Sequence, residues 1–210
     1  MPVGKRAGMP LGISLAELIV VAAVGAVVST VAIGFIISLF RGAARATVRD
    51  GLKSRAIVIV DRILNEMREA TVVSVQLKPT ADASAGSPGV GFTRLLTVTG
   101  TGQRVWEEKS LFYFWTEDSK TLWHTICPPL PAGINHSYVP GRPPVFADDE
   151  LPALFTTGGD NAVPLTRGVT NFAVQENGSL LRLTLLLQEQ SHANRKESFQ
   201  VVRSLKLRNP

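Results

Sequence analysis

The sequence predicts an α+β protein in which one long N-terminal helix packs on an antiparallel β-sheet. Residues 18–40 contain no charged side chain, and apolar positions then recur at helical spacing as far as Ala70. Short alternating segments separated by turn residues follow, the clearest being Asn177-Gly178 between two apolar runs. A helix followed by consecutive hairpins is typical of an α+β domain with the helix laid on the sheet.

The helix is expected to run from Ile13 to about Val73. Its first part, residues 13–40, has the length and composition of a membrane-spanning segment, and residues 41–77 form its amphipathic continuation. Gly51 weakens this second part by about 1 kcal/mol relative to alanine. The apolar stripe that would face the sheet consists of Val48, Leu52, Ala56, Ile59, Ile63, Met67 and Ala70.

A globular β-rich domain is predicted for residues 78–210. It begins with a surface loop, rich in Pro, Ala, Ser and Gly, over residues 78–91. A proline-rich segment of weak periodicity occupies residues 127–164, interrupted by a short element near residues 150–155. Strands are predicted over residues 92–99, 110–116, 121–126, 169–175, 179–187 and 199–207.

Charge and cysteine content limit the function classes. The 210-residue chain has a formal net charge of +5, which would suit an anionic partner, but its basic residues are spread out rather than interleaved with aromatic residues. DNA as a partner therefore has weak support, and a solvated basic surface is favoured. Cys127 is the single cysteine, which excludes an intrachain disulfide and a multi-cysteine zinc or iron–sulfur site.

The apolar segment carries one misplaced charge, Glu17, at its start. A cleaved secretory peptide has an apolar core of about 7–15 residues, shorter than this one, and a lipoprotein signal needs a cysteine at the cut. An uncleaved signal anchor explains the length but not the carboxylate. A central ionisable residue costs about 2.5–3.5 kcal/mol on insertion, so its presence predicts a function.

The charges that flank the apolar segment leave its orientation undecided. Lys5 and Arg6 precede it and favour a cytoplasmic N-terminus. Arg41, Arg45 and Arg49 follow it and favour the opposite orientation just as strongly.

The N-terminus resembles the class III signal of type IV prepilins and type II secretion pseudopilins. In that family a short basic leader ends in Gly, and the mature chain has Thr or Ser second, Glu fifth, and a long apolar helix. Here the leader, residues 1–12, carries Lys5 and Arg6 and ends at Gly12. Ile13 would be the first mature residue, which puts Glu17 at the fifth position.

The resemblance implies a processing and assembly pathway. Prepilin peptidase would cut between Gly12 and Ile13 and methylate the new amine of Ile13. Glu17 would pair with the amine of a neighbouring subunit during assembly. The implied partners are this peptidase, other pilin or pseudopilin subunits, an inner-membrane assembly platform, and membrane lipid before assembly. The protein would cross the inner membrane once, with its C-terminal domain outside the cytoplasm, and then enter a periplasmic pseudopilus or a cell-surface pilus.

Departures from the pattern of major pilins narrow the resemblance. Ile13 stands where Phe or Met commonly follows the cut, and Gly34 lies where a proline often falls. One cysteine cannot form the C-terminal disulfide loop of many major pilins, which favours a minor pilin or pseudopilin. Residues 61–70 and 202–209 also resemble segments of J-type pseudopilins and W-type minor pilins.

Other candidate sites are weaker. His124, Cys127 and His136 are close in sequence, but no accompanying signature supports a Cys/His nucleophilic pair, so no catalytic residue is predicted. No cofactor is predicted.

A cluster of acidic residues raises the question of a calcium site. Asp148, Asp149 and Glu150, with Asp160, offer oxygen ligands of the kind that calcium prefers, but their spacing fits no fixed loop motif. A solvated acidic turn is favoured, no metal site is assigned, and calcium binding is left open.

Two functions from different classes follow. The first is a structural subunit without enzymatic activity, serving a pilus, protein secretion or DNA uptake. Glu17 favours a subunit that docks laterally in the filament over the Glu-lacking terminal subunit of some secretion systems. The alternative is a signal-anchored periplasmic or extracellular domain, binding or enzymatic, with a chance prepilin-like N-terminus.

Overall fold

The computed structural model describes residues 14–80, 86–127, 139, 141–155, 162–190 and 195–208. The expected processing residues Gly12 and Ile13, and also His136 and Asp160, lie outside the described residues. The chain divides into two compact units, Met1–Arg45 and Ala46–Pro210. Helix α1 (Leu15–Met67) is continuous through the boundary between them.

The described part of the first unit is the N-terminal portion of α1. Every residue from 14 to 44 is exposed, including the large apolar side chains. The segment contains no proline, so the helical hydrogen bonds can continue without interruption. This helix is long and apolar enough to span a membrane.

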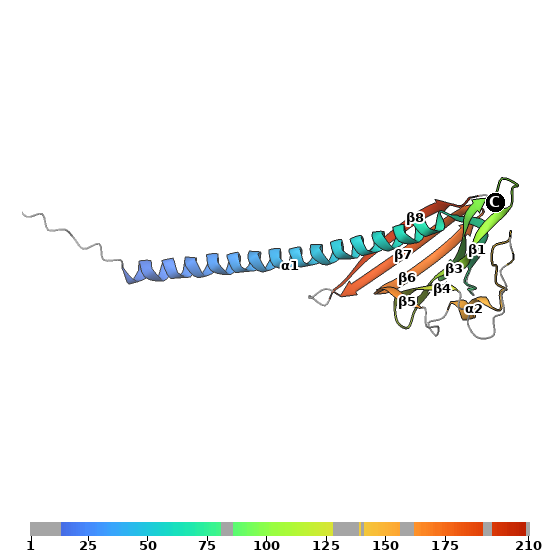
Figure 1. Cartoon of the computed structure of the whole chain (residues 1–210). Helices are drawn as coiled ribbons and strands as arrows, with labels where there is room; N and C mark the ends of the chain where they lie inside the picture. Colours follow the sequence, from blue (N-terminus) through green and yellow to red (C-terminus); the bar gives the residue numbers. More distant parts are fainter. Residues whose placement is uncertain are drawn as a thin grey trace, which may run out of the picture. The chain divides into compact units, whose positions relative to one another are not determined.

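The second unit combines the rest of α1 with two antiparallel sheets and confirms the predicted α+β class (Figure 1). The five-stranded sheet follows chain order: β1 (Ala70–Leu77), β2 (Gly89–Val98), β3 (Arg104–Thr116), β4 (Thr121–Cys127) and β5 (Val163–Arg167). The three-stranded sheet holds β6 (Val169–Asn177), β7 (Leu180–Gln190) and β8 (Lys196–Lys206). A short helix, α2 (Leu151–Leu154), precedes β5.

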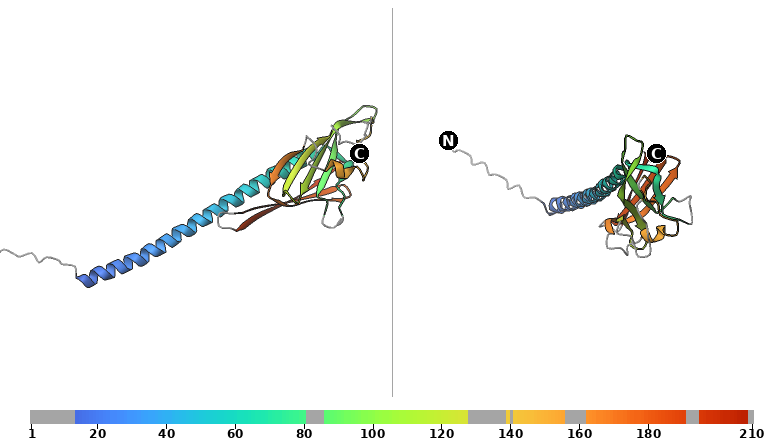
Figure 2. Two further views of the ribbon diagram at one scale, coloured as in Figure 1. Left: turned by 90° about the horizontal axis from the view of Figure 1, so that it is seen from below. Right: turned by 45° about the vertical axis from the view of Figure 1, so that its right-hand side comes forward.

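The main core lies between α1 and the inner faces of both sheets (Figure 2). Alternate residues of β7 point inward, as the period of two along a strand requires. The buried helix residues are Leu52, Ala56, Ile59, Val60, Ile63 and Met67, and all except Val60 belong to the predicted stripe. This confirms that the second part of the helix is amphipathic and packs on sheet.

A second, smaller core covers the other face of the five-stranded sheet. Phe112 and Phe114 of β3 point away from α1 and pack against Leu154 of α2 and the following Phe155. The Phe112 and Phe155 rings meet edge to face, with centroids 5.4 Å apart. The expected short element near residues 150–155 is therefore α2, and it shields this face of the sheet.

The expected end of the helix near Val73 is wrong. Helix α1 ends at Met67, and Ala70 begins strand β1. Residues 71–75 are mostly β-branched, a composition that favours a strand. Ala70 is fully buried, as the apolar stripe suggests, but as a strand residue. The amphipathic helical segment assigned to residues 41–77 is thus helical only as far as Met67.

The number of sheets also differs from the prediction of one. The chain passes from the first sheet to the second at Gly168, whose φ is +75°. A Cβ atom there would lie 2.6 Å from the Gln188 carbonyl oxygen, so the crossing needs glycine both for space and for conformation. Its own carbonyl accepts a hydrogen bond from the Gln188 N–H at 2.7 Å.

The hairpin expected at Asn177-Gly178 is present, and the strands expected over residues 110–116 and 121–126 also pair as a hairpin. Residues 117–120 connect β3 and β4, and Lys120 adopts a positive φ of 48°. Between β6 and β7 the turn residues are Gly178 and Ser179, one position later than expected, because Asn177 still pairs with Leu180. Gly178 has a φ of +60°, as a two-residue hairpin turn requires of its first residue.

Candidate functional site

Ser14 and Glu17 form a reciprocal cap at the start of α1. The Ser14 N–H and hydroxyl both donate to Glu17 Oε2, at 2.9 and 3.1 Å, and the Glu17 N–H donates to Ser14 Oγ at 3.2 Å. This is the arrangement of a capping box, in which the first and fourth residues satisfy two otherwise unpaired backbone donors. Ser-x-x-Glu before an apolar run was the sequence signal that could have assigned Ser14 this role.

The cap engages only one oxygen of the carboxylate. Among the described residues, Glu17 Oε2 accepts both hydrogen bonds from Ser14, and Oε1 has no partner. A carboxylate has lone pairs for further donors on both oxygens. The hydrogen bonds from Ser14 thus orient the Glu17 side chain and leave Oε1 able to accept a further hydrogen bond.

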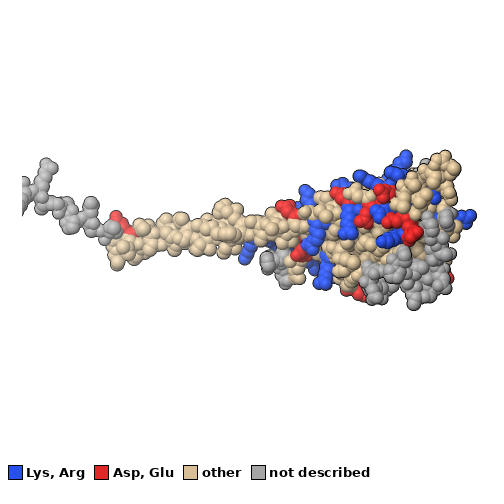
Figure 3. All heavy atoms as spheres, viewed as in Figure 1, with Lys and Arg blue, Asp and Glu red and all other residues tan. Residues whose placement is uncertain are grey.

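The helix that follows Glu17 presents apolar side chains on all sides. On the face seen in Figure 3, a long surface without charged atoms separates the acidic group near the start of the helix from the first basic side chains. Thr30 Oγ1 donates to the Ala26 carbonyl at 2.8 Å, so this hydroxyl is satisfied within the helix. Such a surface requires either lipid or neighbouring apolar chains to cover it.

In the second unit, charged residues near the end of α1 fasten the helix to strand β3. Arg62 Nε lies 3.2 Å from Glu66 Oε1, one helical turn away. The Tyr113 hydroxyl donates a hydrogen bond to Glu66 Oε2. Burial, and then this hydrogen bond to the carboxylate, raise the pKa of Tyr113 well above its ordinary value.

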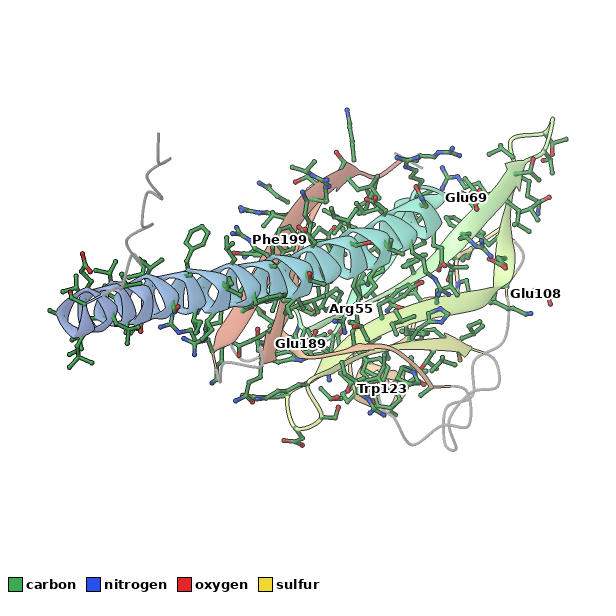
Figure 4. The ribbon with its side chains drawn as sticks, turned by 90° about the vertical axis from the view of Figure 1, so that its left-hand side faces the viewer. Arg55, Glu69, Glu108, Trp123, Glu189 and Phe199 are labelled. Carbon is green, nitrogen blue, oxygen red and sulfur yellow. The ribbon has the colours of Figure 1, made fainter. Side chains whose placement is uncertain are left out.

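A second set of charges joins β2, β3 and the turn that follows α1. Arg94 forms a bidentate pair with Glu107, with nitrogen–oxygen distances of 2.6 and 2.9 Å. Its other terminal nitrogen lies 3.9 Å from Oε2 of Glu69, which is labelled near the end of α1 in Figure 4. Earlier in the helix, the side chains of Arg55 and of Glu189 in β7 point toward one another, with a nitrogen–oxygen distance of 2.6 Å. The Arg55–Glu189 pair thus joins α1 to β7, and the Arg94–Glu69 pair joins the turn after α1 to β2.

The structure separates the two described members of the sequence-adjacent Cys/His group. His124 stacks on the Tyr113 ring, with centroids 4.7 Å apart, on the side of the main core. Cys127 is three residues farther along β4 and points into the second core, on the opposite face of the sheet. Burial lowers the pKa of His124 and raises the pKa of the Cys127 thiol to about 11. The two side chains do not form a nucleophile–base pair.

The acidic turn has a local structural role. Asp148 and Asp149 are exposed, and Glu150 Oε2 accepts a hydrogen bond from the Ala147 N–H at 3.0 Å. Within the part of the chain that the structure describes, no group of three or more His, Cys, Asp or Glu residues could hold a metal ion.

An open groove of about 760 Å³ lies beside this turn, at the junction of the two sheets. Lys78, Ser87 and Asp148 line one part of it, and residues 174–177 of β6 line another. Burial lowers the pKa of Lys78, and burial raises the pKa of Glu176. The groove has no local sequence signature, because its residues come from three distant segments.

The chain was also compared with known proteins. No protein-family model, no curated protein and no solved structure matches it.

Proposed function

We propose that the chain is a minor pilin or pseudopilin, a structural subunit that is processed by prepilin peptidase and assembled into a type IV pilus or type II secretion pseudopilus, or primes its assembly. The observation that carries this proposal is the order of features at the N-terminus: Gly12 and Ile13, then Glu17, then an apolar helix. A helix packed on antiparallel sheet in the second unit is the fold that the resemblance implies.

The exposed apolar surface supports two successive environments for the helix. Before assembly it would lie in the inner membrane, where lipid covers the apolar side chains on all sides. In the filament, the corresponding helices of neighbouring subunits would cover the same surface. Gly25, Ala26 and Ser29 are small residues that permit close contact between helices.

Glu17 would favour transfer of a subunit from the membrane into the filament. A carboxylate in a low-dielectric environment is costly unless a cation or hydrogen-bond donors neutralise it. Ser14 satisfies Oε2 with two hydrogen bonds, and Oε1 stays available for a second donor. The N-terminal amine of a neighbouring subunit, created by the cut before Ile13, is the donor that the pilin resemblance supplies.

The substitution Glu17→Ala tests this role. We expect the variant to be processed by prepilin peptidase as the parent chain is, because the cut precedes Ile13, but to be depleted from sheared filaments or from complexes with the other subunits. Glu108→Ala is the matched control, since Glu108 is an exposed carboxylate of β3. Normal incorporation of the Glu17→Ala chain into filaments would contradict the proposed pairing of Glu17 with a neighbouring amine.

The groove beside Lys78 favours a second candidate. A signal-anchored binding domain, with a chance prepilin-like N-terminus, would use such a groove to hold a ligand outside the cytoplasm. This candidate requires the leader to stay attached in cells that contain active prepilin peptidase. The two candidates therefore differ in the mature N-terminus of the chain.

A further inference from the structure

Two arginines stand where the apolar part of α1 ends. The uncharged segment ends at Phe40, and Arg41 and Arg45 follow at a spacing of four residues. Side chains at this spacing lie on the same side of a helix, about 6 Å apart along its axis. Both residues belong to the first unit. They form a cationic pair at one end of a segment long enough to cross a bilayer.

The pair lacks a compensating anion within the described residues. Among the described residues no ion pair involves Arg41 or Arg45, and the Arg41 side chain is exposed. The sequence holds no acidic residue between Glu17 and Asp50. Arg49 and Lys53 continue the four-residue spacing and add to the positive charge. An anion from outside the chain would therefore be needed to compensate the charge of the two arginines.

The position along the helix identifies the class of that anion. Residues 18–40 span about 35 Å as a helix, slightly more than the hydrocarbon core of a bilayer, so Arg41 would lie at its boundary. The headgroup layer beyond this boundary is about 5–8 Å thick, which matches the rise from Arg41 to Arg45. Guanidinium groups bind phosphate through paired hydrogen bonds.

We propose that Arg41 and Arg45 bind the phosphates of anionic phospholipids, in the leaflet that the helix enters at this end. The interaction holds the unassembled subunit at a fixed depth in the membrane. This inference rests on the membrane-inserted state in the proposed function. Acidic side chains of a neighbouring subunit and nucleic acid are the competing occupants.

Lipid retention by the full chain tests the proposal. The purified protein is placed in detergent micelles that contain equal amounts of phosphatidylglycerol and phosphatidylcholine. Native mass spectrometry then identifies the lipids that stay bound when the protein is released from the micelle. We expect the parent chain to retain phosphatidylglycerol preferentially. The double variant Arg41→Gln/Arg45→Gln should lose this preference by about thirtyfold, since each arginine near an anionic surface contributes a factor of about five.

The control is Arg203→Gln/Lys206→Gln, which removes the same charge from the exposed surface of β8 and should leave the preference unchanged. Circular dichroism of each variant checks that α1 is still formed. Equal retention of both lipids by the parent chain, or an equal loss in the control variant, would overturn the inference while leaving membrane insertion intact. Displacement of the lipid by a short DNA duplex would assign the pair to nucleic acid instead. Retention of neither lipid would count against the membrane-inserted state itself.

Discussion

The Tyr113 hydroxyl donates a hydrogen bond to Glu66, and this contact joins the centre of β3 to the last turn of α1. Tyr113 is fully buried, and Glu66 also pairs with Arg62 on the helix. The contact brings a charged acceptor to the edge of the main core, so removal of its donor should be costly.

Tyr113→Phe is predicted to lower the free energy of unfolding by about 2 kcal/mol. A hydrogen bond to a charged group contributes roughly 1.5–3 kcal/mol, and phenylalanine keeps the ring packing. The measurement is urea unfolding of the full chain in detergent micelles. A double-mutant cycle with Glu66→Gln isolates the pair. A change below about 0.5 kcal/mol for Tyr113→Phe would mean that the contact adds little to stability.

Stability is predicted to fall as the pH drops below the ordinary histidine value of 6.5. Burial lowers the pKa of His124 in the folded chain, and its Nε2 has no hydrogen-bond partner among the described residues. The unfolded state therefore binds a proton that the folded state does not, so its population grows as the pH falls. More than about one pH unit above 6.5 the histidine is neutral in both states and adds no pH dependence.

The slope of unfolding free energy against pH checks this prediction, measured between about pH 7.5 and about pH 5.5. Carboxylates titrate mainly below this window. The slope for the parent chain should be positive and at most about 1.4 kcal/mol per pH unit for this group, and His124→Gln should reduce it. An identical slope in the two proteins would contradict the assignment to His124. Tyr113 stacks on this imidazole, the Glu66 charge opposes the effect of burial on its pKa, and the Arg62 charge adds to that effect.

Cys127 is predicted to resist thiol reagents in the folded chain. Its side chain is 3% exposed, and burial raises the pKa of the thiol to about 11, so little thiolate exists near neutral pH. Alkylation near neutral pH, followed by mass spectrometry, should show modification only after unfolding. Rapid and complete modification of the native protein would mean that the second core opens around β4.

Ser14→Ala is predicted to lower the free energy of opening of the first turn of α1 by about 1 kcal/mol, because the substitution removes the cap hydroxyl. Amide hydrogen exchange of the first turn, in micelles, measures the change. Ser14→Thr should retain protection, and Ser38→Ala, an exposed serine in the same apolar helix, should leave this turn unaffected. If Ser14→Ala left exchange in this turn unchanged, the hydroxyl would not be needed for the cap.

The helix and the hairpins could be predicted because their signals are local. The spacing of apolar residues identified the buried side of α1, and Asn177-Gly178 identified the β6–β7 hairpin to within one residue. The sequence does not predict strand β5, because Pro164 interrupts a short run of strand-forming residues inside a proline-rich segment. The structure places β5 at the edge of its sheet, where proline is tolerated.

The features that could not be predicted depend on contacts between distant residues. The division into two sheets follows from the crossing at Gly168, whose close approach to Gln188 has no local sequence signature. The contact of Glu66 with Tyr113 spans 47 residues. At the N-terminus, the apolar run marks Glu17 as unusual, and the three-residue spacing from Ser14 to Glu17 is the local signal of a capping box.

The mature N-terminus tests the central claim most directly. Mass spectrometry of the intact protein and of its N-terminal peptide, from cells with active prepilin peptidase and from matched cells without it, identifies the first residue. We expect a chain that begins at N-methylated Ile13 in the first case and a chain that retains residues 1–12 in the second. Retention of the leader in both would contradict it.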